Sequence, residues 1–298
     1  MKAAVLKTLG TPLSVETVPD PVLGTGEVIV DVAAAGVLAY ARDVFSGKRN
    51  YLLELPIVPG SGGIGRVRAI GPDATRLAVG DWVFIDPTVR GRDDAVAPDI
   101  ILQGLTAGSE AAYRLQRYYH DGAFAEQVRV PTENAVTIGA IERAEASRWL
   151  GLGRLLVPYG GLLAGRLLPG ETLLINGATG AFGSGGVAMG VAMGAARIVA
   201  TGRNAEVLAD LEHRLGDRKV GTHVGRRVGR AQSQRQRPFE VARQQPWGKG
   251  VGEVPVVVER VEPDGGVRGG DAALRIAEIG EGQRRLHQHV RVVGIERH

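Results

Sequence analysis

The stretch that most constrains the fold runs from residue 172 to residue 201, where a short apolar run, a glycine-rich turn, a helix-like segment and a second apolar run follow one another. "TLLIN" and "ARIVAT" have the length and composition of buried strands, and "GGVAMGVAMGA" between them has the length and small residues of a helix. Two parallel strands joined by a crossover helix form a βαβ unit, the building block of α/β domains. The sequence therefore predicts an α/β domain in the second half of the chain.

The turn inside this unit has the spacing of a dinucleotide-binding turn. Ala178, Gly180 and Gly183 fit the pattern A-x-G-x-x-G, in which backbone N–H groups and the helix N-terminus receive a pyrophosphate. Gly180 would let the phosphates approach the backbone, and Gly183 would let the helix pack closely on the sheet. The predicted cradle consists of Gly177, Ala178, Thr179, Gly180, Ala181, Phe182 and Gly183. The alternative is a sharp glycine-rich turn that binds no ligand.

The end of the second strand indicates which dinucleotide the turn would bind. NAD sites commonly place an Asp or Glu here to bond the ribose 2′-hydroxyl, whereas this chain has Gly202, Arg203 and Asn204. An arginine pairs with a 2′-phosphate, which a carboxylate would repel. The sequence therefore predicts NADP(H) in preference to NAD(H), with Arg203 and Asn204 as further cofactor-binding residues. The alternative is that Arg203 is only an exposed loop arginine.

The first 140 residues have a different pattern. Short runs rich in Val and Ile, such as "EVIVDVAAAGV", "GIGRVRAI" and "DWVFI", are separated by Gly, Pro and Asp, which favours a barrel or sandwich of short strands. From about Ile141 Leu and Ala recur at helical spacing, so we expect one domain over 1–140 and another over 141–298. Residues 149–168 are very apolar, but Arg154 and Arg166 interrupt them, and we expect a buried helix and no membrane partner.

These motifs together resemble one family. "VPGSGGIGRVRAIG", "VGDWVFI", "DGAFAEQVRVP" and "LPGETLLINGATGAFG" are similar to the medium-chain dehydrogenase/reductase superfamily, and in particular to its zinc-free quinone-oxidoreductase-like branch, over residues 1 to about 212. The resemblance implies an N-terminal GroES-like β-barrel domain followed by a Rossmann-like, doubly wound parallel sheet. It also implies a cytoplasmic oxidoreductase that transfers a hydride between NADP(H) and a small-molecule carbonyl, enone, quinone or alcohol substrate.

The chain departs from the zinc-dependent members of this family at the metal-binding positions. In those members a cysteine follows "GV" in the third strand, a His-Glu pair follows "PG", and a second cysteine opens the helix before the Rossmann strand. This chain has Leu38, then Ser61 with Gly62, and then Gly153 at those places, and it contains no cysteine at all. None of these residues supplies a thiolate or an imidazole, so we expect no zinc.

Without a metal, a polar side chain has to stabilise the charge that develops on the substrate. Tyr40 follows the third strand, in the loop that faces the nicotinamide in this family, and is the candidate catalytic residue, as a donor of a hydrogen bond or a proton. The alternative is that its ring only packs against the wall of the cleft. Tyr118, Tyr119 and His120 form a polar aromatic cluster in which His120 is a second candidate, as a proton relay, although a loop histidine is more often only solvated.

The tail from His213 has a composition of its own. It carries 17 Lys and Arg against 10 acidic residues, so the net charge of +4 comes from the tail. Basic surfaces that bind nucleic acid interleave aromatic residues with the charges, and the tail has only Phe239 and Trp247, so we expect no nucleic-acid partner. No acidic residue accompanies His287 and His289 as a further ligand, so they predict no metal site.

Residues 213–253 contain no compact apolar run of the kind that a Rossmann strand needs, whereas 254–261 and 289–295 resemble strands and 271–279 a short helix. We hypothesise that the tail is an out-of-frame continuation of a GC-rich gene; the alternative is a divergent tail with a basic surface. With a damaged C-terminal half, the chain would be a catalytically inactive relative that binds a nucleotide or a partner. The resemblance also implies a homodimer through a Rossmann edge strand, which would lie in this tail.

Overall fold

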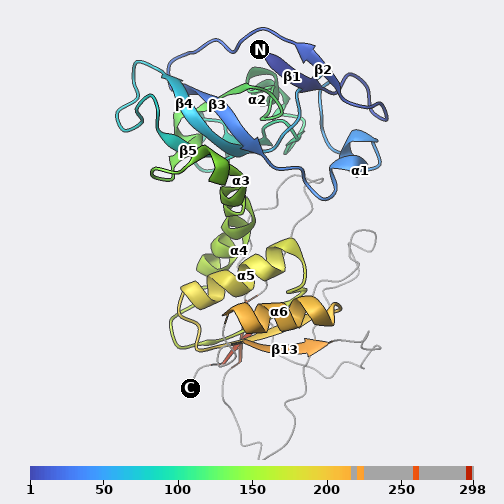
Figure 1. The fold of residues 1–298 in the computed structure, drawn as a ribbon, viewed down its shortest axis with the longest axis vertical. Helices are drawn as coiled ribbons and strands as arrows, with labels where there is room; N and C mark the ends of the chain where they lie inside the picture. The colour runs from blue at the N-terminus through green and yellow to red at the C-terminus, as the bar shows by residue number, and fades with distance from the viewer. Residues whose placement is uncertain (216–219, 225–257, 262–292, 297–298) are drawn as a thin grey trace, which may run out of the picture. The chain divides into compact units, whose positions relative to one another are not determined.

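The structure is a computed structural model that describes residues 1–215, 220–224, 258–261 and 293–296 (Figure 1). The chain divides into two compact units at residues 153 and 154. The described residues of the first unit are 1–153, and those of the second are the remainder. The domain boundary predicted from the sequence, after residue 140, stays a prediction.

The first unit is built from short antiparallel strands with a few short helices. The largest sheet has the strand order β10-β5-β4-β3-β9, and β1-β2 and β6-β7-β8 form two smaller sheets. The strands are β1 (Lys2–Val5), β2 (Ser14–Thr17), β3 (Glu27–Ala35), β4 (Gly63–Ile70), β5 (Trp82–Ile85), β6 (Thr88–Arg90), β7 (Ile100–Leu102), β8 (Thr106–Ala107), β9 (Gln127–Pro131) and β10 (Ala135–Thr137). The helices are α1 (Ala41–Phe45), α2 (Tyr113–Tyr118), α3 (Ala146–Trp149) and the short 3₁₀ turns η1 (Thr132–Asn134) and η2 (Arg143–Glu145).

Alternation along the strands gives the largest sheet of this unit two different faces. In β4 the exposed Arg66 and Arg68 flank Val67, which is buried with valines of β3 and β5. Side chains of a strand point to opposite faces in turn, so these valines form a core on one face, and a second buried cluster with Ile64 and Phe84 covers part of the other. Register shifts in the pairing of β3 with β4 bend the sheet at two points. The β-rich first domain predicted from the sequence is confirmed.

The second unit contains the predicted βαβ unit. Strand β11 (Thr172–Asn176) pairs in parallel with β12 (Arg197–Gly202), and α5 (Ala181–Ala192) is the crossover helix between them. Helix α6 (Ala205–Leu215) follows β12. The buried core draws Leu173 from β11, Val187 from α5, Ile198 from β12, and Leu208 and Leu211 from α6. These leucine, isoleucine and valine side chains pack the two helices against the sheet, which confirms the predicted α/β architecture.

One strand of this sheet was not expected. β13 (Val220–Val224) pairs in parallel with β12, although the sequence analysis found no strand between residues 213 and 253. The segment "VGTHV" has only two valines and no run of neighbouring apolar residues, so composition alone does not identify it as a strand. Farther along, β14 (Val258–Val261) pairs in parallel with β15 (Val293–Glu296), and both overlap segments predicted as strands. The helix predicted at 271–279 lies outside the described residues.

The helix predicted in the apolar stretch 149–168 is α4 (Leu152–Ala164), but it is not buried on all sides. Pro158 and Leu162 are buried, whereas the side chains of Leu156 and Leu163 are 46% and 51% exposed. Apolar residues occupy nearly every position of this helix, so their periodicity could not show which face the protein covers. Across the part of the chain that the structure describes, no helix has the length and the apolar character needed to cross a membrane.

Candidate functional site

The predicted dinucleotide-binding turn connects β11 to α5. Gly177, at the end of β11, has a φ of +70°, a conformation that only glycine adopts without cost. The N–H of Gly180 donates to the carbonyl of Gly177 (2.9 Å), which closes a tight turn, and Gly180 then caps α5 with an extended backbone. The N–H of the buried Ala178 donates to the carbonyl of Thr201 (2.9 Å) and so ties the turn to the end of β12.

The two glycines that give this turn its spacing differ in what the fold requires of them. A Cβ on Gly183 would lie 2.1 Å from the carbonyl oxygen of Gly177 and 2.8 Å from the Cα of Ala178, so the first turn of α5 packs directly on the backbone of the preceding turn. A Cβ on Gly180 would meet only the Gly177 oxygen, at 3.3 Å, and the φ of Gly180 is −86°, which any residue adopts. The fold therefore needs a glycine at 183 far more than at 180. A glycine at 180 suits the N-cap of α5 and would also leave room for a close ligand.

The end of β12 lies against this turn. A Cβ on Gly202 would be 2.5 Å from Cγ2 and 3.0 Å from Oγ1 of Thr179. The hydroxyl of Thr201 donates to the Oδ1 of Asn176 (2.8 Å), so the two strand ends are also joined through their side chains. From the sequence, Gly202 indicates only that no carboxylate stands at the end of this strand. Nothing in the local sequence shows that Thr179 and Gly202 meet across the crossover helix.

The two residues predicted to complete the cofactor site have different surroundings. Arg203 is exposed, and its guanidinium forms no ion pair with the residues that the structure describes. Asn204 caps α6, because its Oδ1 accepts from the N–H of Val207 (3.1 Å) and its carbonyl from the N–H of Leu208 (3.2 Å). Arg203 is thus available to a ligand, whereas the side chain of Asn204 already has a structural role.

The predicted catalytic residue, Tyr40, lies immediately before α1 and is half-buried. The ring of Tyr51 meets it edge-on with centroids 6.3 Å apart, and the guanidinium of Arg49 lies 4.3 Å from its ring centroid. Burial, followed by the neighbouring Tyr51 phenol, raises the pKa of Tyr40 to about 12. At neutral pH its hydroxyl is therefore protonated, and can donate a hydrogen bond.

The predicted cluster of Tyr118, Tyr119 and His120 separates into two groups. The two tyrosine rings meet edge to face at 4.9 Å, and the guanidinium of Arg129 lies 4.6 Å from one ring centroid and 5.7 Å from the other. Burial, followed by the charge of Glu27, raises the pKa of Tyr119 to about 12. His120 instead pairs its Nδ1 with the Oδ1 of Asp121 (2.9 Å).

The residues at the positions where zinc-dependent members have their metal ligands contact ordinary parts of the fold in this chain. Leu38 lies between β3 and α1, and Ser61 and Gly62 directly precede β4. A Cβ on Gly153, in the first turn of α4, would meet the ring of Phe84 at 3.9 Å. Within the described ranges, three or more His, Cys, Asp or Glu side chains nowhere gather in the manner of a metal site. The absence of zinc stays a prediction.

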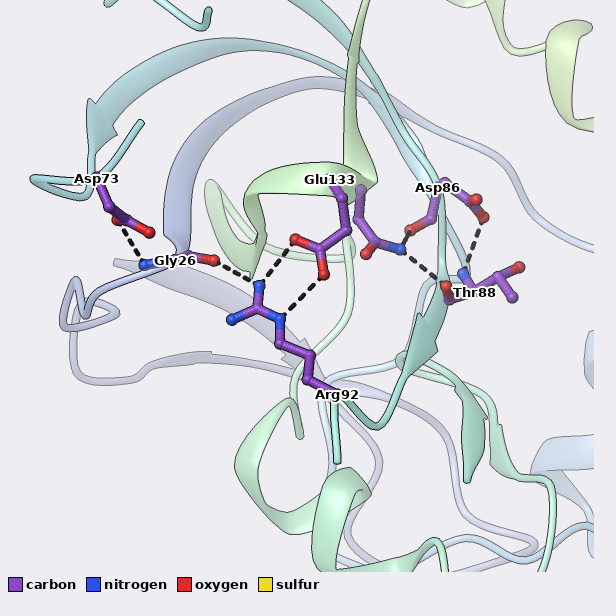
Figure 2. A network of polar contacts seen from close by, with 7 residues as sticks. Gly26, Asp73, Asp86, Thr88, Arg92 and Glu133 are labelled. Atoms are coloured by element: carbon purple, nitrogen blue, oxygen red, sulfur yellow. Dashed lines mark hydrogen bonds and ion pairs between the residues drawn. The ribbon is translucent and has the colours of Figure 1, made fainter. Parts of the chain in front are cut away.

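A polar network in the first unit was missed by the sequence analysis (Figure 2). Arg92 donates from Nη2 to the carbonyl of Gly26 (2.9 Å), and from Nε and Nη2 to the two carboxylate oxygens of Glu133 (3.0 and 2.8 Å). The N–H of Gly26 donates to the carboxylate of Asp73 (2.7 Å). The side-chain amide of Asn134 donates to the carbonyls of Asp86 (2.8 Å) and Thr88 (2.9 Å). A surface hollow of about 750 Å³ lies beside these groups. Because Arg92 and Glu133 satisfy one another, we assign the network a role in holding the loops together.

Comparison with known proteins agrees with this fold. Residues 24–140 match the alcohol dehydrogenase GroES-like domain family. An alcohol dehydrogenase of Geobacillus stearothermophilus is 33% identical over 46% of this chain and 40% of its own length. An acryloyl-coenzyme A reductase of Metallosphaera sedula is 29% identical over 74% of this chain and 64% of its own length.

Solved structures give the same picture. The alcohol dehydrogenase from Aeropyrum pernix superposes with a TM-score of 0.60 at 26% identity, over 74% of this chain and 64% of that one. A thermostable alcohol dehydrogenase from Pyrobaculum aerophilum superposes with a TM-score of 0.58 at 26% identity, over 74% and 65%. The chain spans less than two thirds of the length of each of these four relatives. The GroES-like match, these relatives and the βαβ unit with its glycine turn support the assignment of the chain to the medium-chain dehydrogenase/reductase superfamily.

Proposed function

We propose that the chain is an oxidoreductase that transfers a hydride between NADP(H) and a small carbonyl, enone, quinone or alcohol substrate, without zinc. The observation that carries the cofactor choice is the end of β12, where Gly202 packs against Thr179 and is followed by the exposed, unpaired Arg203 of the described chain. The names of the relatives, alcohol dehydrogenase and acryloyl-coenzyme A reductase, support an oxidoreductase.

The turn after β11 fits a pyrophosphate. The first hydrogen bond of α5 runs from the N–H of Ser184 to the carbonyl of Gly180, so the N–H groups of residues 181–183 precede it and have no partner within the helix. Together with the positive end of the helix dipole they form a set of donors for an anion. The absence of a Cβ at Gly180 leaves these donors open to a close approach. These donors support the proposal that the turn holds the pyrophosphate of a dinucleotide.

The same geometry favours the phosphorylated dinucleotide. A carboxylate at position 202 would require a Cβ, and a Cβ there would lie 2.5 Å from the side chain of Thr179. The usual acidic partner of the NAD ribose is therefore disfavoured at this position by packing. Arg203, the next residue, would instead form charge-assisted hydrogen bonds to a 2′-phosphate. Glu206 is the acidic residue in the first turn of α6, and it lies one turn farther along the chain.

Tyr40 supplies the polar group of the proposed site. Bound NADP(H) would supply or accept the hydride. The phenol of Tyr40 would donate a hydrogen bond to the substrate oxygen and stabilise the negative charge that develops there. Its pKa of about 12 keeps the proton on the phenol at neutral pH. Leu38, Ser61 and Gly153 offer no thiolate or imidazole, and thus the proposal assigns this stabilisation to a side chain rather than to a metal.

A fluorescence titration with NADPH and NADH tests the cofactor choice. We expect the wild-type chain to bind NADPH more tightly than NADH, and Arg203→Ala to weaken NADPH about tenfold or more, as expected for loss of a charge-assisted hydrogen bond, while NADH changes little. Arg197→Ala is the matched control, because Arg197 is an exposed arginine at the opposite end of β12. Equal losses for both cofactors, or losses in the control, would contradict the role of Arg203.

Turnover is measured separately, as oxidation of NADPH in the presence of aldehydes, enones and quinones. Sustained oxidation supports the proposed reaction. Saturable NADPH binding without oxidation of any substrate would favour the alternative predicted from the sequence, a protein that binds a nucleotide or a partner without catalysis.

A further inference from the structure

The loop after α1 places a cation directly on the candidate catalytic tyrosine. The N–H of Arg49 donates to the carbonyl of Asp43 (3.0 Å), and the N–H of Tyr51 donates to the carbonyl of Arg49 (2.8 Å), so the loop folds back toward the start of the helix. The guanidinium carbon of Arg49 consequently lies 4.3 Å from the centroid of the Tyr40 ring. A guanidinium in this position is attracted to the ring face, which restricts its movement.

Arg49 lacks the ion pair that several arginines of this unit have. Arg92, Arg117 and Arg129 each face a glutamate, with N–O distances between 2.7 and 3.5 Å. The guanidinium of Arg49 forms no ion pair and no side-chain hydrogen bond within the described part of the chain, and the residue is exposed. The N–H groups of this guanidinium, which match the geometry of a carboxylate or phosphate, therefore have no oxygen partner among the described residues.

The charges around Arg49 favour an anion. Arg42 and Lys48 are exposed and likewise have no ion-pair partner among the described residues, so three cations belong to this one short segment. Asp43 is the single acid between residues 38 and 52, and it is partly buried. Tyr40 adds no negative charge, because its phenol stays protonated at neutral pH. The segment that contains Tyr40 therefore carries a net positive charge, and Arg49 is the cation that contacts the tyrosine ring.

We propose that Arg49 binds an anionic group of the substrate, a carboxylate or a phosphate ester, while Tyr40 donates to the carbonyl oxygen of the same molecule. The substrate class would thus be aldehydes, ketones or enones that carry a negative charge. The proposal rests on the proposed function, because it takes Tyr40 as the group that contacts the carbonyl. It assigns Arg49 a binding role in addition to its contact with the tyrosine ring.

Matched pairs of aldehydes test this proposal. Benzaldehyde and 4-formylbenzoate differ by a carboxylate, and glyceraldehyde and glyceraldehyde 3-phosphate differ by a phosphate. NADPH oxidation is measured for all four with the wild-type chain, Arg49→Gln, Arg49→Lys and the control Arg114→Gln, which removes an exposed arginine from α2. We expect the wild type to prefer at least one anionic member by about tenfold in kcat/KM, the scale of a hydrogen bond to a charged group.

The variants separate binding from positioning. We expect Arg49→Gln to lower kcat/KM for the preferred anionic member about 30-fold and to change the neutral member by less than about threefold, with the loss mainly in KM. Arg49→Lys keeps the charge but not the paired N–H groups of the guanidinium. Its kcat/KM for the anionic member should therefore lie between those of the wild type and Arg49→Gln. The aldehyde pair in which Arg49→Gln lowers kcat/KM for the charged member identifies the bound group as a carboxylate or a phosphate. Equal losses for charged and neutral aldehydes would overturn the proposal and leave Arg49 as a positioning residue for Tyr40.

A binding measurement keeps this test independent of turnover. Isothermal titration calorimetry measures the affinity of 4-formylbenzoate and of glyceraldehyde 3-phosphate for the same four proteins in the presence of NADP⁺. If NADPH is not oxidised but one anionic aldehyde binds, and binds at least about tenfold more weakly to Arg49→Gln, the proposed reaction fails and the anion site stands. If neither anionic aldehyde binds to the wild-type chain, the anion site is wrong. Circular dichroism of each variant confirms that it is folded.

Discussion

The candidate cofactor site and the candidate substrate site are built in opposite ways. The turn between β11 and α5 is built from backbone atoms, and its two glycines matter because they lack side chains: Gly183 leaves room for the turn itself, and Gly180 would leave room for the proposed ligand. The surroundings of Tyr40 work through side chains, since Arg49 covers one face of its ring and Tyr51 meets it edge-on. One site is sensitive to any added atom, and the other to the loss of particular groups.

This difference predicts how each site fails when it is mutated. An added Cβ in the glycine turn pushes against backbone, which cannot move without moving β11 or α5, so the effect reaches the stability of the second unit. A side chain removed near Tyr40 leaves the backbone in place, because the loop is held by main-chain hydrogen bonds of Arg49 and Tyr51. Function should therefore be separable from stability at Tyr40, and inseparable from it at Gly183.

The largest effect is expected for Gly183→Ala. Its Cβ would lie 2.1 Å from the oxygen of Gly177, which no rotation of a side chain can relieve. We expect the free energy of unfolding of the second unit to fall by about 3 kcal/mol or more, at the upper end of overpacking effects. Urea denaturation followed by circular dichroism measures this loss. Gly160→Ala in α4 is the control, because nothing lies within 4 Å of its added Cβ, and an unchanged stability of Gly183→Ala would show that the turn is looser than described.

The second prediction concerns Tyr40→Phe. Removal of the phenol takes away the proposed hydrogen bond to the substrate oxygen, and we expect kcat to fall about 100-fold, as for the loss of one donor to a developing oxyanion. NADPH affinity and the free energy of unfolding should change little, because the ring and its contacts with Arg49 and Tyr51 remain. Steady-state kinetics and urea denaturation are the measurements. A full rate with Tyr40→Phe would mean that the tyrosine only packs against its neighbours.

The sequence allowed the backbone-built site to be predicted much better than the site built from side chains. Ala178, Gly180 and Gly183 stand close together in the chain, and their spacing states the requirement directly. The contact of Thr179 with Gly202 joins residues on either side of the crossover helix, and no local pattern shows it. Tyr40 was identifiable as a candidate, but Arg49 and Tyr51 reach it only because the loop folds back on α1. β13 escaped prediction because parallel pairing with β12, rather than its own apolar content, makes it a strand.

The third prediction separates the two glycines of the turn. Gly180→Ala adds a Cβ that would lie 3.3 Å from the Gly177 oxygen, a much milder contact than the 2.1 Å at Gly183, in a backbone conformation open to any residue. We expect the free energy of unfolding to change by less than about 1 kcal/mol, whereas NADPH binding weakens about tenfold because the phosphate is held away from the N–H groups. The measurements are urea denaturation and fluorescence titration on the same preparation. Unchanged NADPH affinity would remove the main physical reason for assigning the turn to a dinucleotide.

The smallest effect is expected for a side-chain pair of the first unit, His120 and Asp121. The hydrogen bond from His120 to the carboxylate of Asp121 raises the pKa of His120, although burial opposes the shift. Burial alone would raise the pKa of Asp121, but its bonds to His120 and to the N–H of Val58 outweigh this and lower it. A raised histidine pKa stabilises the fold fully below the unfolded value of about 6.5 and ceases to do so as the pH rises through the folded value. A lowered aspartate pKa stabilises the fold above about pH 4 and ceases to do so as the pH falls through the folded value.

The pair should therefore contribute most between about pH 4 and pH 6.5. Both side chains are partly exposed, so we expect His120→Gln to remove only about 0.5 kcal/mol at pH 5.5 and almost nothing at pH 9. Urea denaturation of the two proteins at both pH values measures the difference. A loss as large at pH 9 as at pH 5.5 would mean that His120 stabilises the first unit by packing and not by charge. In that case a side chain of the first unit would act through packing, as the glycine turn of the second unit does. The contrast between the two regions would then be narrower.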